Sequence, residues 1–126
     1  NQTFSYGLEA GLTEAIVSEI RRSTPWKVTD AEAAQTSLKG TITSVDMSRL
    51  STARDTGLVE QLAVTITVEF TWKDNRTGRT LVARQNFQGS GTFVPTGGYR
   101  ERLAVGEDDA TQRLARDLVA ELRSAW

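Results

Sequence analysis

The feature that most constrains the fold is a strict alternation of side chains in the stretch 62–74, LAVTITVEFTWKD. The even positions are large and apolar, whereas the odd positions are small or polar: Leu62, Val64, Ile66, Val68, Phe70 and Trp72 against Ala63, Thr65, Thr67, Glu69, Thr71 and Lys73. Successive side chains of a strand point to opposite faces, so this pattern predicts a β-strand over 61–73. The apolar face of the strand must be buried in a core, whereas the threonine-rich face can contact water or a partner.

A second strand is predicted over 38–50, LKGTITSVDMSRL. Its apolar positions alternate through Leu38 and Ile42 and then change phase at Val45. One extra residue in a strand produces such a change, so we expect a β-bulge near Ser44.

A third long strand is predicted over 79–94, after a hairpin loop at 74–78 whose glycine supplies a positive φ. Its alternation predicts one apolar face and one polar face: Leu81, Ala83, Phe87 and Phe93 with Gly89 and Gly91 on the first, and Thr80, Arg84, Asn86, Gln88, Ser90 and Thr92 on the second. We also expect a short strand at 26–28.

Two amphipathic helices are predicted, over 5–22 and 107–125. Pro25 ends the first helix, a loop at 95–106 precedes the second, and a polar connection at 51–59 joins the first two long strands. Each helix has a single apolar stripe, so both should pack on the apolar face of the sheet. The sequence therefore predicts one α+β domain over 1–126, a two-layer sandwich with two helices on a mainly antiparallel sheet of three long strands plus a short one.

Composition excludes several classes of function. The 126 residues include no histidine and no cysteine, which removes the usual general base, the thiolate nucleophile and the common ligands of zinc. The net charge of −1 gives no excess positive charge for nucleic acid, and no stretch approaches the roughly 20 apolar residues of a membrane span. Neither a cofactor nor a metal is expected. A carboxylate-dependent enzyme using Glu69 or Asp74 remains the only catalytic hypothesis.

Several segments resemble one known family. They are NQTFSYGLEAGLTEAIVSEIRRSTPWKVTD, LKGTITSV, VEFTWKDNRTGRTL and DDATQRLARDLVAEL. Together they are similar to the LptE-type lipopolysaccharide-assembly lipoproteins, in a divergent branch of the kind found in planctomycete-like bacteria. The resemblance covers nearly the whole chain and depends on element order and scattered residues. It implies an α/β sandwich that is no enzyme and that is lipid-anchored at the periplasmic face of the outer membrane.

The resemblance also implies partners and contact residues. Members plug the barrel of LptD, help that barrel to assemble, and help lipopolysaccharide to pass through it. The polar sheet face would then be the contact surface, with Thr65, Thr67, Thr71, Arg84 and Asn86 as its residues. Four cations near one hairpin are the candidates for glycolipid phosphate: Lys73, Arg76, Arg79 and Arg84.

The chain departs from the family pattern at its start. The lipidated cysteine, the leader and the apolar first strand that precedes the NQTF-like segment are all absent from the sequence. We therefore expect an N-terminally trimmed chain whose sheet has an unpaired edge, beside 26–28, that can pair with another copy.

A second resemblance competes with the first. The segment LTEAIVSEIRRSTPWKVTD is similar to the N-terminal part of CsgG-like and LpoB-like envelope lipoproteins, which build secretion pores or activate peptidoglycan synthases. Those domains place helices between their strands, whereas this sequence predicts three long strands in succession. The strand order favours the LptE-type interpretation.

Overall fold

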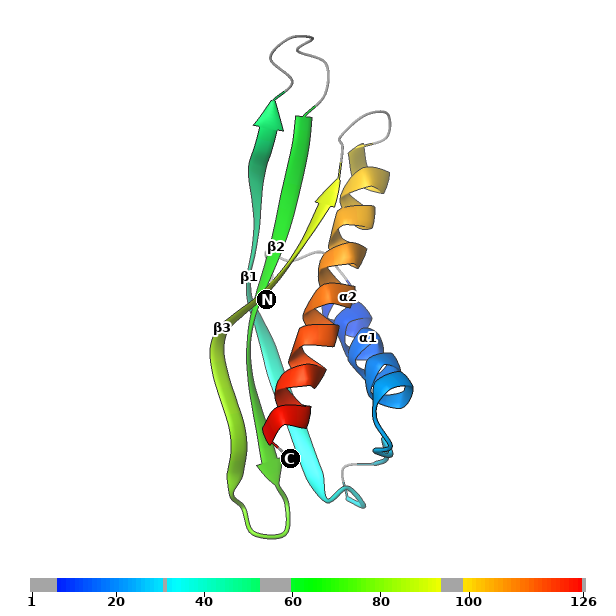
Figure 1. The fold of residues 1–126 in the computed structure, drawn as a ribbon, viewed down its shortest axis with the longest axis vertical. Helices are drawn as coiled ribbons and strands as arrows, with labels where there is room; N and C mark the ends of the chain where they lie inside the picture. The colour runs from blue at the N-terminus through cyan, green and yellow to red at the C-terminus, as the bar shows by residue number, and fades with distance from the viewer. Residues whose placement is uncertain (1–6, 31, 53–59, 94–98, 126) are drawn as a thin grey trace.

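The computed structural model describes residues 7–30, 32–52, 60–93 and 99–125. The elements in chain order are α1 (Leu8–Ser23), β1 (Thr36–Thr52), β2 (Glu60–Asp74), β3 (Thr80–Phe93) and α2 (Tyr99–Ala125). Figure 1 shows the strands as one long, twisted layer with both helices on the same side of it. The predicted α+β sandwich of two helices and three long strands is confirmed.

The strands form an antiparallel meander in the order β1-β2-β3. In β1, Leu38 lies opposite Trp72 and Met47 lies opposite Val64, with a register shift between Ile42 and Ser44. The predicted bulge is therefore confirmed, and Thr43 is its extra residue. The Thr43 hydroxyl donates a hydrogen bond of 3.2 Å to the Thr67 carbonyl, which holds the bulge against β2.

The core lies between the sheet and the helices. From Val64 to Trp72, the even side chains of β2 are at most 4% exposed. They pack with the stripes of both helices: Leu8 and Leu12 of α1, and Ala110, Leu114, Leu118 and Leu122 of α2. The alternation that predicted a one-sided strand thus gives the buried layer of the sandwich.

Glycines bring β3 and α2 into unusually close contact. A Cβ atom built on Gly89 would lie 2.6 Å from the Leu114 Cβ, and one on Gly91 would lie 2.6 Å from the Ala110 nitrogen. Gly106 of α2 is equally crowded, because a Cβ there would lie 2.6 Å from Cδ1 of Phe93. At Gly89 and Gly91 the strand therefore lies directly against the backbone of α2, and at Gly106 the helix lies directly against the Phe93 ring.

The start of α2 differs from the prediction. The helix begins at Tyr99, eight residues before the predicted start at Glu107, so residues 99–106 are helical and not a loop. A glycine inside a helix costs about 1 kcal/mol relative to alanine, and for this reason Gly106 was assigned to the predicted loop. Its contact with Phe93 explains why a glycine stands inside this helix.

The predicted short strand at 26–28 is wrong, since these residues have no strand pairing. The Trp26 ring lies 5.5 Å from the Trp72 ring, centroid to centroid. The backbone N–H of Trp26 donates to the Thr24 hydroxyl at 3.2 Å. The indole therefore closes the end of the core, and the segment crosses that end without lying along the sheet.

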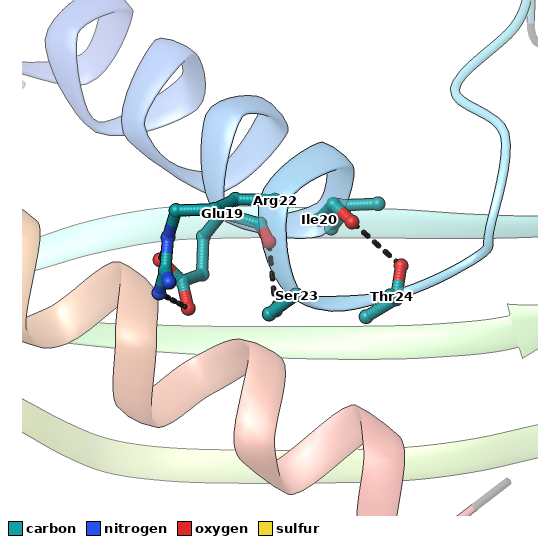
Figure 2. A network of polar contacts seen from close by, with 5 residues as sticks. All are labelled: Glu19, Ile20, Arg22, Ser23 and Thr24. Carbon is teal, nitrogen blue, oxygen red and sulfur yellow. Dashed lines mark hydrogen bonds and ion pairs between the residues drawn. The ribbon is translucent and has the colours of Figure 1, made fainter.

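Side chains fix the C-terminal end of α1, as Figure 2 shows. The Ser23 hydroxyl donates to the Glu19 carbonyl at 2.7 Å, and the Thr24 hydroxyl donates to the Ile20 carbonyl at 2.6 Å. The Arg22 guanidinium pairs with the Glu19 carboxylate at 2.6 Å. The hydrogen bond from Arg22 lowers the pKa of Glu19.

Candidate partner-binding face

The candidate surface is the sheet face that points away from the helices, called here the outer face. In β2 it consists of the odd positions, and in β1 and β3 of their cross-strand neighbours. No helix among the described residues lies on this side (Figure 1). The predicted contact residues Thr65, Thr67 and Thr71 all lie on it.

Hydroxyl and amide groups pair across the strands of the outer face. The Thr65 and Ser90 hydroxyls are 2.8 Å apart, and the Gln88 side-chain amide donates to the Thr67 hydroxyl at 3.2 Å. Thr67 is only 4% exposed, whereas Thr71 is exposed and Thr65 is half-buried. Of the three threonines, Thr71 therefore exposes the most surface to a partner, whereas the Thr67 hydroxyl is hydrogen-bonded within the sheet.

Arg84 does not lie on the outer face. It is opposite Phe70, on the helix side of the sheet, and its Nε donates to Oε1 of Glu121 in α2 at 2.9 Å. The cause is a bulge, because Val68 pairs with Phe87 while Phe70 pairs with Arg84, and Asn86 has a φ of 57°. The predicted faces of Ala83 and Arg84 are therefore wrong. A second register shift, between Trp72 and Lys73, leaves Thr80 opposite Lys73 on the outer face, as predicted, and Leu81 packs against the core.

The same bulge changes which apolar residues of β3 are buried. Val82 is 3% exposed, whereas Ala83, predicted on the apolar face, is exposed opposite Thr71. The sequence contained a signal for this. Val82 and Phe87 are both suited to a core but have opposite parity, which one strand can satisfy only with an inserted residue. Asn86 is exposed at the insertion, and asparagine tolerates positive φ better than most residues.

The four predicted cations separate into two groups. Lys73, Arg76 and Arg79 are exposed in the β2–β3 hairpin, while Arg84 is paired with α2. Inside the hairpin, the Asp74 carboxylate accepts the Arg76 backbone N–H at 2.9 Å and lies 3.7 Å from the Arg76 Nε. Gly78 has the predicted positive φ, at 78°. The hairpin therefore presents three exposed cations at one end of the sheet.

The outer face carries polar groups that can form contacts with a partner. A depression of about 710 Å³ lies over it, lined by Lys39, Thr41, Glu69, Thr71 and Ala83 among others. Glu69 is exposed, and Asp74 is half-buried as a hairpin residue. Within the described ranges, no three acidic side chains come together as a metal ligand set. Hydroxyls, amides and a few charges, arranged on an antiparallel sheet, suit hydrogen bonding to another polar surface.

Comparisons with known proteins identify relatives of the chain. The model of the LptE family, described as lipopolysaccharide-assembly, matches residues 1–125. The crystal structure of a presumed lipoprotein from Caulobacter crescentus CB15 superposes with a TM-score of 0.62 and 12% sequence identity, covering 96% of this chain and 84% of that one. At that identity the likeness shows the fold alone. A search of curated protein sequences found no match. No helix in the described ranges is both long and apolar enough to cross a membrane.

Proposed function

The chain belongs to the LptE lipopolysaccharide-assembly family, and from that premise we propose that it is a non-enzymatic lipoprotein that plugs an LptD-like β-barrel of the outer membrane. In this proposal the protein sits at the periplasmic face, held by a lipid anchor. It helps the barrel to assemble and assists the insertion of lipopolysaccharide.

The outer face is the observation that supports the plug. The lumen of a membrane β-barrel is polar, so a domain inside it needs a polar surface rather than an apolar one. Thr65 and Thr67 already have hydrogen-bond partners across the strands, while Thr71 and Lys73 are exposed beside them. Such a face is rigid and polar, and docking it against another polar wall leaves few groups without partners.

The hairpin cations support the glycolipid part of the proposal. Lys73, Arg76 and Arg79 are exposed within one turn and its flanking strands. Guanidinium and ammonium groups bind phosphate oxygens through charge-assisted hydrogen bonds, and lipopolysaccharide carries phosphate. Arg84 is assigned no part in this contact, because it is paired with Glu121.

The plug is tested by affinity purification of the full-length, lipidated protein from its native envelope, with mass spectrometry of the proteins recovered. We expect a large β-barrel in stoichiometric amount, and we expect Thr71→Arg combined with Lys73→Glu to reduce its recovery. Gln112→Glu, at an exposed position on α2, gives the same net change of charge and is the matched control. If the outer-face substitutions leave the amount of recovered β-barrel unchanged, the proposed contact surface is wrong. Peptidoglycan synthases in place of a barrel would support the CsgG-like or LpoB-like alternative.

The glycolipid contact is tested by the binding of purified lipopolysaccharide to the folded chain. Arg76→Glu combined with Arg79→Glu should weaken binding, and wild-type binding should weaken as salt screens the charges. Arg123→Glu, at the exposed end of α2, is the control. Equal binding by both variants would assign the contact to another surface, while leaving the plug test unaffected.

A further inference from the structure

The outer face has two halves that differ in their hydrogen bonding. The bulge at Asn86 separates the hairpin half, which leads to the β2–β3 turn, from the far half, which leads to the other end of β2. In the far half the polar side chains bond to one another: the Thr65 and Ser90 hydroxyls are 2.8 Å apart, and the Gln88 amide donates to the Thr67 hydroxyl at 3.2 Å. A partner that covered these groups would bury hydrogen bonds that already exist and would gain few new ones.

The hairpin half carries polar groups of a different kind. Lys39, Glu69, Thr71 and Lys73 are exposed there. Lys39 lies opposite Thr71 across the β1–β2 pair. Within the described ranges, the side chains of Lys39, Glu69 and Thr71 form no hydrogen bond or ion pair. Their hydrogen-bonding capacity is therefore available to a partner.

The bulge also hollows the outer face. It places Ala83 opposite Thr71, so two short side chains lie next to each other on β2 and β3. The longer side chains of Lys39, Glu69 and Gln85 line the same depression of about 710 Å³. A side chain of a partner can enter the sheet surface at this point, and side chains that fill such depressions contribute most of the binding energy of an interface.

Charge favours an anionic group in the depression. Lys39 is directly across from Thr71, and Lys73 is two residues further along the same face of β2, so two ammonium groups flank one hydroxyl. Glu69 is two residues from Thr71 in the other direction, so a single negative charge opposes two positive ones. The far half carries the opposite sign at Asp46, which is exposed on β1.

The depression does not depend on what lies along the edge of β1. Side chains stand roughly perpendicular to a sheet, whereas strand pairing takes place in its plane. A strand added along β1 would therefore leave Lys39 and Thr71 on the outer face.

Building on the plug function proposed above, we propose that the barrel wall meets the hairpin half of the outer face, and that a carboxylate side chain of the wall enters the depression. The ammonium groups of Lys39 and Lys73 and the hydroxyl of Thr71 donate hydrogen bonds to that carboxylate. Glu69 restricts the depression to one anionic group and accepts a hydrogen bond from a neutral donor beside it. The partner surface is thus polar, with one carboxylate next to an amide or hydroxyl.

Photochemical cross-linking in the full-length, lipidated protein locates the contact. Gln85, at the margin of the depression, and Thr92, in the far half, are both exposed on β3. A photoreactive phenylalanine analogue replaces each residue in turn, and the native envelope is irradiated before purification. We expect a cross-link to the β-barrel from position 85 and none from position 92.

Substitutions test the charge. Lys39→Glu should lower the yield of co-purified β-barrel by roughly tenfold, because it places a carboxylate beside the partner's carboxylate and removes a donor. Glu69→Gln removes the opposing charge and should leave the yield at the wild-type level or above it. Arg123→Glu, exposed at the end of α2, gives the same change of net charge as Lys39→Glu and is the matched control. Circular dichroism should show all three variants folded.

The hairpin half can be the wrong contact while the plug is right. If the wild-type protein recovers no β-barrel, the plug function and the docking half are both wrong. If the barrel is recovered but does not cross-link to position 85, or cross-links to position 92 as well, only the assignment of the hairpin half is wrong. Equal yields with Lys39→Glu and Arg123→Glu would overturn that assignment too, and a loss of barrel with Glu69→Gln would contradict an anionic partner group.

Discussion

The contact between β3 and α2 predicts a large effect from one added methyl group. Gly89→Ala places a Cβ 2.6 Å from the Leu114 Cβ and 2.9 Å from the Leu114 Cα and nitrogen. Two of these three atoms belong to the helix backbone, so no rotamer change can relieve the overlap, and α2 must move away from the sheet. Overpacking of this kind costs about 1–3 kcal/mol, and we expect the upper part of that range. For a domain of this size the thermal midpoint should fall by about 5–15 °C.

Urea denaturation monitored by tryptophan fluorescence gives the free energy of unfolding for this comparison. Gly11→Ala is the matched control, because Gly11 is exposed inside α1 and a Cβ there meets nothing within 4 Å. That substitution should stabilise the protein by about 0.5–1 kcal/mol through helix propensity. If Gly89→Ala unfolds at the wild-type urea midpoint, the strand and helix are not in backbone contact, and the packing argument fails.

Three further predictions concern charge and backbone geometry. A double-mutant cycle of Arg84→Gln and Glu121→Gln should give a coupling below about 1 kcal/mol that shrinks in salt, since both side chains are about a third or more exposed. A coupling well above 1 kcal/mol, or one that salt leaves unchanged, would contradict a solvent-screened pair. Asn86→Val should cost roughly 1–2 kcal/mol because a β-branched residue resists a φ of 57°, whereas Asn86→Gly should be nearly neutral in the same assay. Arg22 lowers the pKa of Glu19, so the stabilisation is present above the unfolded pKa and is lost as the pH falls through the folded pKa. Glu19→Gln should therefore lower stability near neutral pH, with a difference from wild type that disappears in acid; a pH-independent difference would contradict this.

The fold was predictable where a side-chain pattern acts within one element. The alternation around Val64 and Phe70 predicted the central strand and its buried face, and the change of phase at Val45 predicted the β1 bulge. These features depend on which side chains avoid water, and that information is local to the strand.

Features that depend on contacts between elements were missed. The glycine at 106 favours a loop by propensity, but it lies inside a helix, where the Phe93 ring occupies the space that a side chain would fill. The sequence predicted a strand at Trp26, but the indole packs on Trp72 and the segment forms no strand. Propensity is outweighed by tertiary packing at both positions.

The outer face was predictable only where the alternation of a strand is uninterrupted. Alternation correctly placed Thr65 and Thr71 on the outer face, since both are in the uninterrupted strand. It failed for Arg84, because the bulge at Asn86 exchanges the faces of Ala83 and Arg84, until a second register shift between Trp72 and Lys73 restores the predicted face at Thr80. It could not show that Thr67 is buried by its cross-strand neighbours, since the identity of those neighbours depends on register.

The meander has a consequence for the order of folding. Each strand pairs with its neighbour in sequence, and β3 leads into α2, on which it packs, so these contacts close short loops. α1 is different, because it packs on α2 at the opposite end of the chain and must close a loop of nearly the whole domain. Local contacts form early and distant ones late. We therefore expect the three strands and α2 to assemble first and α1 to dock last. Substitutions that weaken α1 should then accelerate unfolding and leave the refolding rate nearly unchanged.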